Sequence, residues 1–177
     1  MEKSKLLAEF FIFEDFSGEL LRELTDQVEI MEFKAGQDVF VEGQEAVRLY
    51  GLMKGTVELV VAVRDKVLKT DIRFEDYSRR KTESADRNIV VTTIGSHEIF
   101  GWSSLSPAGR YTSRAVCVEP VTVVAIATDK LREYFTRRPE AGYPFMEKIL
   151  GIASRRFTET RDKLAEGWIE AFRVDRV

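Results

Sequence analysis

The sequence has very few of the residues that form disulfides and metal sites. Its 177 residues include one cysteine, Cys117, and one histidine, His97. A single cysteine excludes an internal disulfide, so the sequence predicts a cytoplasmic protein. One cysteine and one histidine are too few for a zinc site. His97 lies in a turn-like GSHE stretch and is expected to be a solvated turn residue. We therefore expect no metal site and no catalytic residues.

Long apolar runs are also missing. No uninterrupted apolar stretch approaches the roughly 20 residues that a membrane-spanning helix needs, so no membrane association is expected. Acidic residues interrupt the apolar patch in residues 1–16, and no small-residue cleavage site follows it, which argues against a signal peptide. With 44% hydrophobic and 32% charged residues, the composition is typical of a soluble globular protein. We expect a single domain over residues 1–177.

A large excess of positive charge is missing too. The net charge is −3, with 13 acids against 6 bases in residues 1–60 and 17 acids against 21 bases in residues 61–177. A nucleic-acid-binding domain is usually strongly basic, with its charge gathered on one face. The charge therefore argues against direct DNA binding, while the second half of the chain is better suited to hold a small anion.

From Glu29 to about residue 127 the sequence has the pattern of short β-strands. Runs such as DVFV, RLYGLM, TVELVVAV, NIVVTTI and VTVVAIA alternate with turn signals. Gly36, Gly55 and Gly95 each precede a short apolar run, and a glycine at such a corner can adopt a positive φ. The pattern predicts a mainly β (α+β) fold, built as a sandwich, jelly roll or small barrel.

Helical periodicity flanks the predicted strands. Residues 3–13 and 17–28 space their apolar residues as helices do, and Ser17 is a plausible N-cap of the second. Beyond the last strand, Asp129 is expected to cap one helix and Pro144 to lie in the first turn of another.

The last predicted helix carries an apolar seam. Its members follow at steps of threes and fours, as in a coiled coil: Met146, Leu150, Ala153, Phe157, Thr160 and Leu164. The seam predicts a homodimer through the helix at about 144–166. The alternative is a helix that folds wholly back onto its own domain.

The segment 64–87 is dense in charge of both signs. One interpretation is a long solvated hairpin or mobile loop, which would be the most mobile part of the domain. The other is a hairpin that docks a partner through Arg79, Arg80 and Lys81.

The stretch IFGWSSLSPAGRYTSRAV, residues 99–116, gathers hydroxyls and arginines after a glycine. A helix start presents free N–H groups to an anion, and an arginine fork matches phosphate oxygens. The candidate ligand-binding residues are Phe100, Gly101, Trp102, Ser103, Ser104, Leu105, Arg110, Thr112, Ser113 and Arg114.

Taken together, these segments resemble the cyclic-nucleotide-binding domain of the catabolite-activator and FNR-like regulators over roughly residues 12–165. The resemblance implies an antiparallel β-roll or jelly roll over about 29–127, flanked by N-terminal helices. It also implies C-terminal helices over about 129–168, the last of them long and often dimerising. Three segments carry the resemblance: FKAGQDVFVEGQEAVRLYGLMKGTVELV at 33–60, IGSHEIFGWSSL at 94–105 and RAVCVEPVTVVAIATDKLREYF at 114–135.

In that family a phosphate-binding cassette reads Phe-Gly-Glu, two small or aliphatic residues and Leu, with Arg-Ser/Thr-Ala roughly ten residues later. Phe100, Gly101, Ser104 and Leu105 match this pattern. Trp102 stands where the family has a glutamate that accepts from the ribose 2′-hydroxyl, and an indole can donate but not accept. Losing that bond would weaken a cyclic nucleotide by about tenfold to a few hundredfold. Another small anion, or no ligand, is therefore expected, and Trp102 could instead be a packing residue that plugs the cassette.

The cassette arginine is ambiguous. Arg110 comes about two residues early and precedes Tyr111, whereas Arg114 comes late and directly precedes Ala115. Either could hold an anion, so both remain candidates.

The sequence therefore predicts a stand-alone regulatory sensor module. Its ligand would be a cyclic nucleotide or another small anion, with altered specificity, and it would signal through an unidentified protein partner; no cofactor is expected. The family's helix-turn-helix module is not expected in the dozen residues after Ala165. The alternative is a ligand-free dimerisation or protein-interaction domain with a filled pocket. A cupin-like enzyme is not expected, because its metal would need several histidines.

Overall fold

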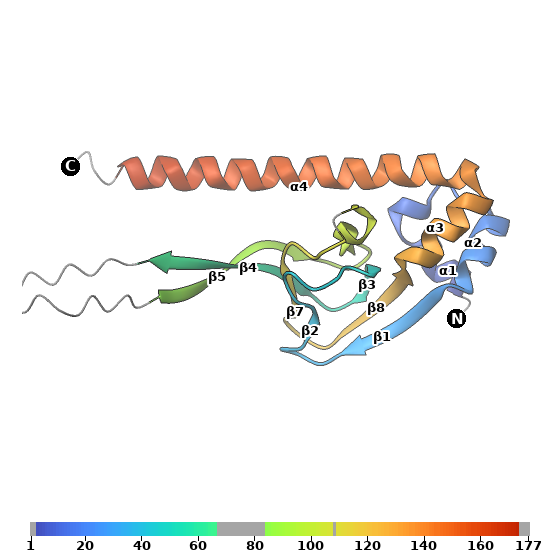
Figure 1. Cartoon of the computed structure of the whole chain (residues 1–177), viewed down its shortest axis with the longest axis horizontal. Helices are drawn as coiled ribbons and strands as arrows, with labels where there is room; N and C mark the ends of the chain where they lie inside the picture. Colours follow the sequence, from blue (N-terminus) through green and yellow to red (C-terminus); the bar gives the residue numbers. More distant parts are fainter. Residues whose placement is uncertain (1–2, 67–83, 108, 174–177) are drawn as a thin grey trace, which may run out of the picture.

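The computed structural model describes residues 3–66, 84–107 and 109–173 and has the predicted β-roll architecture, with helices from both ends of the chain packed on the roll (Figure 1). Two four-stranded antiparallel sheets form the roll, in the orders β1-β8-β3-β6 and β2-β7-β4-β5. The strands are β1 (Val28–Phe33), β2 (Asp38–Phe40), β3 (Arg48–Lys54), β4 (Val57–Lys66), β5 (Ser84–Ile94), β6 (Ile99–Phe100), β7 (Arg114–Cys117) and β8 (Val121–Ala127). The helical segments are α1 (Lys3–Ala8), η1 (Phe11–Phe13), α2 (Gly18–Thr25), η2 (Trp102–Leu105), α3 (Thr128–Arg137) and α4 (Pro139–Arg173).

The most apolar strand, β8, lies inside the first sheet. It pairs with β1 on one side and β3 on the other, from Val121 to Ala127. Its side chains are buried almost without a break because the sheet covers both of its edges and packing covers both of its faces. This explains why the run VTVVAIA lacks the polar–apolar alternation of a half-exposed strand.

The hairpin of β4 and β5 extends into the charged segment, as the interpretation of a long hairpin expects. Pairing continues from Val57↔Ile94 to Lys66↔Ser84, whereas the sequence predicted strands only at 56–63 and 88–94. Residues 67–83 lie outside the described part of the chain. The predicted mobility of this segment and its docking role through Arg79, Arg80 and Lys81 therefore stay predictions.

Two hydrophobic clusters stabilise the fold. Between the sheets, aromatic rings pack together: Phe40, Tyr50, Phe100 and Tyr111. The second cluster joins the terminal helices to the outer face of the first sheet, and its largest members are Phe10, Phe13, Tyr134 and Phe145. The N-terminal and C-terminal helices therefore share one core, which fixes the base of α4 on the roll.

The helix boundaries differ in part from the predictions. Ser17 is the N-cap of α2, as predicted, and its Oγ accepts from the Leu20 N–H at 3.3 Å. The single helix predicted over 3–13 is divided into α1 and η1. The predicted cap at Asp129 is wrong, because α3 already begins at Thr128.

The start predicted for the last helix at Pro144 is also wrong. Helix α4 begins at Pro139, and Pro144 lies inside it. A proline suits the first helical position because its missing N–H would have no partner there, and Pro139 takes that position five residues earlier.

The corner glycines behave as predicted in two of three turns. Gly36 and Gly55 have φ values of 77° and 94°. Gly95 does not have a positive φ; in that turn His97 takes it, at 67°. The His97 side chain is half exposed and its Nε2 lies 2.9 Å from Glu9 Oε2. His97 is therefore the exposed turn residue that the sequence predicted, with an acidic neighbour from the N-terminal region.

Helix α4 is long and only partly supported by the roll. Its 35 residues span about 52 Å. Ala141, Phe145, Ile149 and Ile152 are buried against the domain, whereas residues 157–170 are all exposed. The alternative of a helix folded wholly back onto its domain is therefore wrong for the described part of α4.

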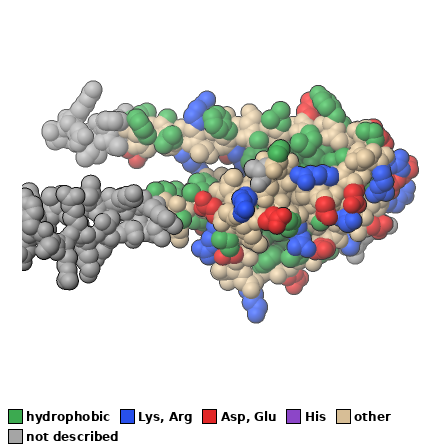
Figure 2. All heavy atoms as spheres, in the orientation of Figure 1, with side chains coloured by type: hydrophobic (Ala, Val, Ile, Leu, Met, Phe, Trp, Pro, Cys, Tyr) green, Lys and Arg blue, Asp and Glu red, His purple; other side chains and the backbone are tan. Residues whose placement is uncertain are grey.

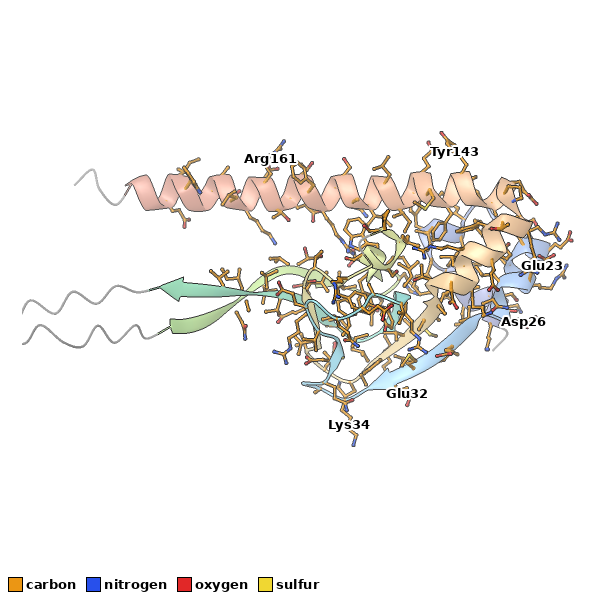
Figure 3. The ribbon with its side chains drawn as sticks, viewed as in Figure 1. Glu23, Asp26, Glu32, Lys34, Tyr143 and Arg161 are labelled. Carbon is orange, nitrogen blue, oxygen red and sulfur yellow. The ribbon has the colours of Figure 1, made fainter. Side chains whose placement is uncertain are left out.

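The seam predicted on α4 is divided between two sides of the helix. Ala153, Phe157 and Thr160 line a cavity between α4 and the second sheet, whereas the other members are exposed. Tyr143 and Arg161 project from the side of α4 that points away from the roll (Figure 3), and hydrophobic side chains gather along the helix (Figure 2). Met146, Leu150 and Leu164 are exposed to 47%, 69% and 62%.

In the described part of the chain no helix combines the length and the low polarity needed to cross a bilayer.

Candidate ligand-binding site

The corner at residues 100–105 is built around a backbone position that favours glycine. Strand β6 ends at Phe100, whose side chain is fully buried and stacks on Tyr50 with ring centroids 5.3 Å apart. Gly101 follows with φ 77°, in the left-handed region, and η2 begins at Trp102. A Cβ at Gly101 would lie 2.9 Å from Tyr50 Cδ2 and 3.2 Å from the Arg48 carbonyl oxygen. The Phe-Gly pair therefore sets the direction of η2, and a glycine is required both by conformation and by space.

A cavity of about 340 Å³ lies between this corner, the second sheet and α4. Ligand sites in proteins typically start at about this size. One wall is apolar and includes Leu59 and Val61 of β4 and Val91 of β5. Helix α4 contributes Ala153, Arg156, Phe157 and Thr160. We refer to this space as the α4 cavity.

Five of the ten predicted site residues line the α4 cavity: Gly101, Trp102, Ser103, Thr112 and Ser113. The hydroxyls of Ser103 and Thr112 lie 3.4 Å apart, so the two ends of the predicted cassette meet there. Phe100 and Leu105 belong to the hydrophobic clusters of the domain.

Neither predicted arginine is among the residues of this wall. Arg110 is exposed, and its Nη1 donates to the Gly43 carbonyl oxygen at 2.7 Å. Arg114 donates from Nε to Asp38 Oδ1, also at 2.7 Å, which forms an ion pair between β7 and β2. Each guanidinium therefore has a local partner away from the cavity.

Tyr111, between the two arginines, is a structural residue. Its ring stacks on Phe40 with centroids 3.8 Å apart, and its hydroxyl donates to the Arg48 carbonyl oxygen at 2.9 Å. Burial raises the pKa of Tyr111 well above that of a free tyrosine. Tyr111, which follows Arg110 where the family's pattern has Ser or Thr, is therefore part of the core between the sheets.

Ser104 belongs to a different space. It lies 1% exposed on the other side of η2, beside a second cavity of about 430 Å³ between η2 and α3. Its Oγ has no hydrogen-bond partner among the described residues, and Arg132 Nη2 donates to its carbonyl oxygen at 3.3 Å. The predicted cassette is thus divided between two cavities.

The sequence reading missed Arg156, the only cation lining the α4 cavity among the described residues. Its Nη2 donates to the Ile99 carbonyl oxygen at 2.6 Å, and its guanidinium carbon lies 5.3 Å from the centre of the Trp102 ring. A signal was present: Ala153, Arg156, Phe157 and Thr160 are spaced three, four and seven residues apart, so they share one helical face.

A metal site finds no support in the described residues. No group of three histidine, cysteine, aspartate or glutamate side chains among them could hold a metal ion. Cys117 is buried, and burial raises the pKa of its thiol. The α4 cavity therefore offers hydroxyls, one guanidinium and apolar walls, which suit an organic anion.

Comparison with known proteins identifies a family whose sequence model matches this chain. The sequence model of the cyclic nucleotide-binding domain matches residues 30–138. A regulator of Mycobacterium tuberculosis named as a CRP-like cAMP-activated global transcriptional regulator is 28% identical over 162 residues, covering 92% of this chain and 62% of the relative. The chain thus spans less than two thirds of that relative's length.

Solved structures share the fold. A protein from Geobacter metallireducens described as a putative cyclic nucleotide-binding protein has a TM-score of 0.66 at 24% identity, covering 89% of this chain and 99% of that one. A cyclic nucleotide-binding domain from Methylobacillus flagellatus has a TM-score of 0.69 at 17% identity, covering 94% and 82%. The match to the family model spans more than half of the chain, so this protein belongs to the cyclic nucleotide-binding domain family.

Proposed function

We propose that this protein is a regulatory sensor module that binds a small organic anion in the α4 cavity and signals through protein contacts. The observation that carries the proposal is the cavity itself. It joins hydroxyls of the cassette, Ser103 and Thr112, to a helix that reaches well beyond the domain. A ligand there touches both the rigid roll and α4, so binding can alter the surface that α4 offers to a partner.

The specificity of the cavity is proposed to differ from the family's usual one. Trp102 lines the cavity where the resemblance expects a carboxylate, and the wall has no acidic side chain among the described residues. A ribose hydroxyl would lose its charged acceptor there, and a site built around a ligand hydroxyl discriminates strongly when the partner is lost.

The ligands named for related proteins indicate which compounds to test. The Mycobacterium tuberculosis relative is named as cAMP-activated. A Trypanosoma cruzi regulatory subunit of a cAMP-independent protein kinase A, with a TM-score of 0.60 and 18% identity, was solved bound to guanosine. We therefore propose a thermal-shift screen of cyclic nucleotides, nucleoside monophosphates and nucleosides. A ligand at about 100 times its Kd adds roughly 2.7 kcal/mol to the free energy of unfolding, which is readily seen.

For cyclic nucleotides the expected result is weak binding. Calorimetry with cyclic AMP and cyclic GMP should give no Kd tighter than about 10 micromolar for the wild type. Trp102→Glu restores an acceptor and should tighten cyclic AMP binding by about tenfold or more, because a hydrogen bond to a charged group stabilises by roughly 1.5–3 kcal/mol.

The matched control for this experiment is Trp102→Leu, which removes the indole without adding an acceptor. A gain in both variants would mean that the indole only blocks the site. Submicromolar binding of cyclic AMP to the wild type would contradict the altered specificity.

The proposed route of signalling is a homodimer through α4. The exposed seam of Met146, Leu150, Phe157 and Leu164 is more apolar than a solvated helix needs. The same seam supports the second candidate function, a ligand-free dimerisation or interaction domain with a filled pocket, in which Trp102 plugs the cassette. The absence of any thermal shift across the screen, together with a stable dimer, would favour this second candidate.

A further inference from the structure

Arg156 carries a partly buried charge that forms no ion pair with the described residues. Its Nη1 is buried and has no hydrogen-bond partner among the described residues. Its Nη2 is held by the Ile99 carbonyl oxygen at 2.6 Å, and Trp102 lies against the guanidinium at 5.3 Å. Neither contact supplies a negative charge.

Three arginines that join elements of the domain have carboxylate partners. Arg48 lies 3.1 Å from Glu29, Arg114 lies 2.7 Å from Asp38, and Arg138 pairs with Glu19 and Glu23. Arg156 forms no ion pair with a carboxylate in the described part of the chain. Burial lowers the pKa of Arg156, and the nearby Glu98 and Glu159 oppose this shift without reversing it. A partly buried guanidinium without a counter-ion costs stability, and an anion that supplies the missing acceptor would recover it.

The surroundings of Arg156 also restrict what that anion can be. The cavity wall has hydroxyls near the cassette, at Ser103 and Thr112, and apolar side chains on β4, β5 and α4. A simple inorganic ion would leave the apolar part unfilled. A ligand with one anionic group and an aromatic or apolar body of nucleotide size matches both parts.

We propose that Arg156 of α4, rather than Arg110 or Arg114 of the cassette, binds the anionic group of the ligand in the α4 cavity. This rests on the proposed function, that the cavity binds a small organic anion. In this assignment the positive charge that binds the anion is on the long helix α4 and not on the roll. An anion bound by the Arg156 guanidinium would tie α4 to the cassette through a contact that the free protein lacks.

The first test compares a charged probe with its neutral counterpart. Adenosine 5′-monophosphate and adenosine share a base and a ribose, so the ratio of their affinities measures how much the phosphate contributes to binding. Calorimetry on the wild type should give a ratio in favour of the monophosphate of about tenfold to a hundredfold. In Arg156→Gln the ratio should fall to about one, while the affinity for adenosine changes less than about threefold.

Arg110→Gln and Arg114→Gln are the matched controls, and both should keep the wild-type ratio. Loss of the ratio in either of them, with its retention in Arg156→Gln, would overturn the assignment and leave the proposed function intact. Failure of the wild type to bind any charged nucleotide would overturn the proposed function and the assignment with it.

The second test needs no ligand. If Arg156 is held ready for an anion, its unpaired charge weakens the free protein, and Arg156→Met should melt at the wild-type temperature or above it. Adding adenosine monophosphate should then raise the melting temperature of the wild type but not that of Arg156→Met. A lower melting temperature for Arg156→Met in the absence of ligand would mean that the arginine is structural, and would contradict the proposal.

Discussion

A Leu150→Glu/Leu164→Glu double variant is expected to be a folded monomer at concentrations where the wild type is a dimer. Both leucines are mostly exposed in the isolated chain, at 69% and 62%, so their loss should change the free energy of unfolding by less than about 0.5 kcal/mol. In a two-fold dimer the seam would bury four such side chains, each contributing roughly 1.5–3 kcal/mol. The dimer Kd should therefore rise by at least about a thousandfold.

Sedimentation between about 1 and 100 micromolar protein would measure this change. Gly151→Glu/Thr158→Glu is the matched control, because each position follows a seam position by one residue and is exposed. This control adds the same charge off the seam and should stay dimeric. Phe157 is left unchanged because it also lines the α4 cavity. A wild type that sediments as a monomer at tens of micromolar would contradict the proposed dimer.

Gly101→Ala is expected to lower the free energy of unfolding by about 3 kcal/mol. A left-handed backbone costs a residue with a side chain roughly 1–2 kcal/mol. The added Cβ would also press on Tyr50 at 2.9 Å, inside the aromatic cluster between the sheets. Crowding in a packed core typically costs a further 1–3 kcal/mol.

Gly43→Ala separates these two causes. Gly43 has φ 79°, close to the 77° of Gly101, but a Cβ there would meet nothing within 4 Å. Urea unfolding should show a loss of about 1 kcal/mol for Gly43→Ala and a distinctly larger loss for Gly101→Ala. Equal losses would mean that Tyr50 moves aside at little cost and that the corner is not tightly packed.

The sequence predicted a mainly β fold because its strand and turn signals are local and strong, and the family resemblance implied the β-roll. The run VTVVAIA can only be a buried strand or a buried helix, and the turn signals around it favour a strand. Ser17 is a good cap with apolar residues spaced behind it. The start of the last helix was predicted wrongly because Pro139 and Pro144 both suit the first helical position. Ala141 and Phe145 pack against the domain, which favours the start at Pro139.

The site was predictable only where its residues are close together in the chain. Gly101, Trp102 and Ser103 follow one another, and their motif could be recognised. Arg156 lies more than fifty residues away and reaches the cavity only because α4 returns along the roll. Conversely, Arg114 matched the expected chemistry, but strand pairing places it beside Asp38, a contact that no local pattern reveals.

The exposed end of α4 has a consequence for the chain's conformational equilibrium. Residues 157–170 form about four turns of helix with no buried side chain. Isolated helices of this length are marginal in water, and propagation from the supported turns weakens toward a free end. A partner that covers the seam would therefore also stabilise the helical form of this segment. Association and the helical stability of these last turns are expected to increase together.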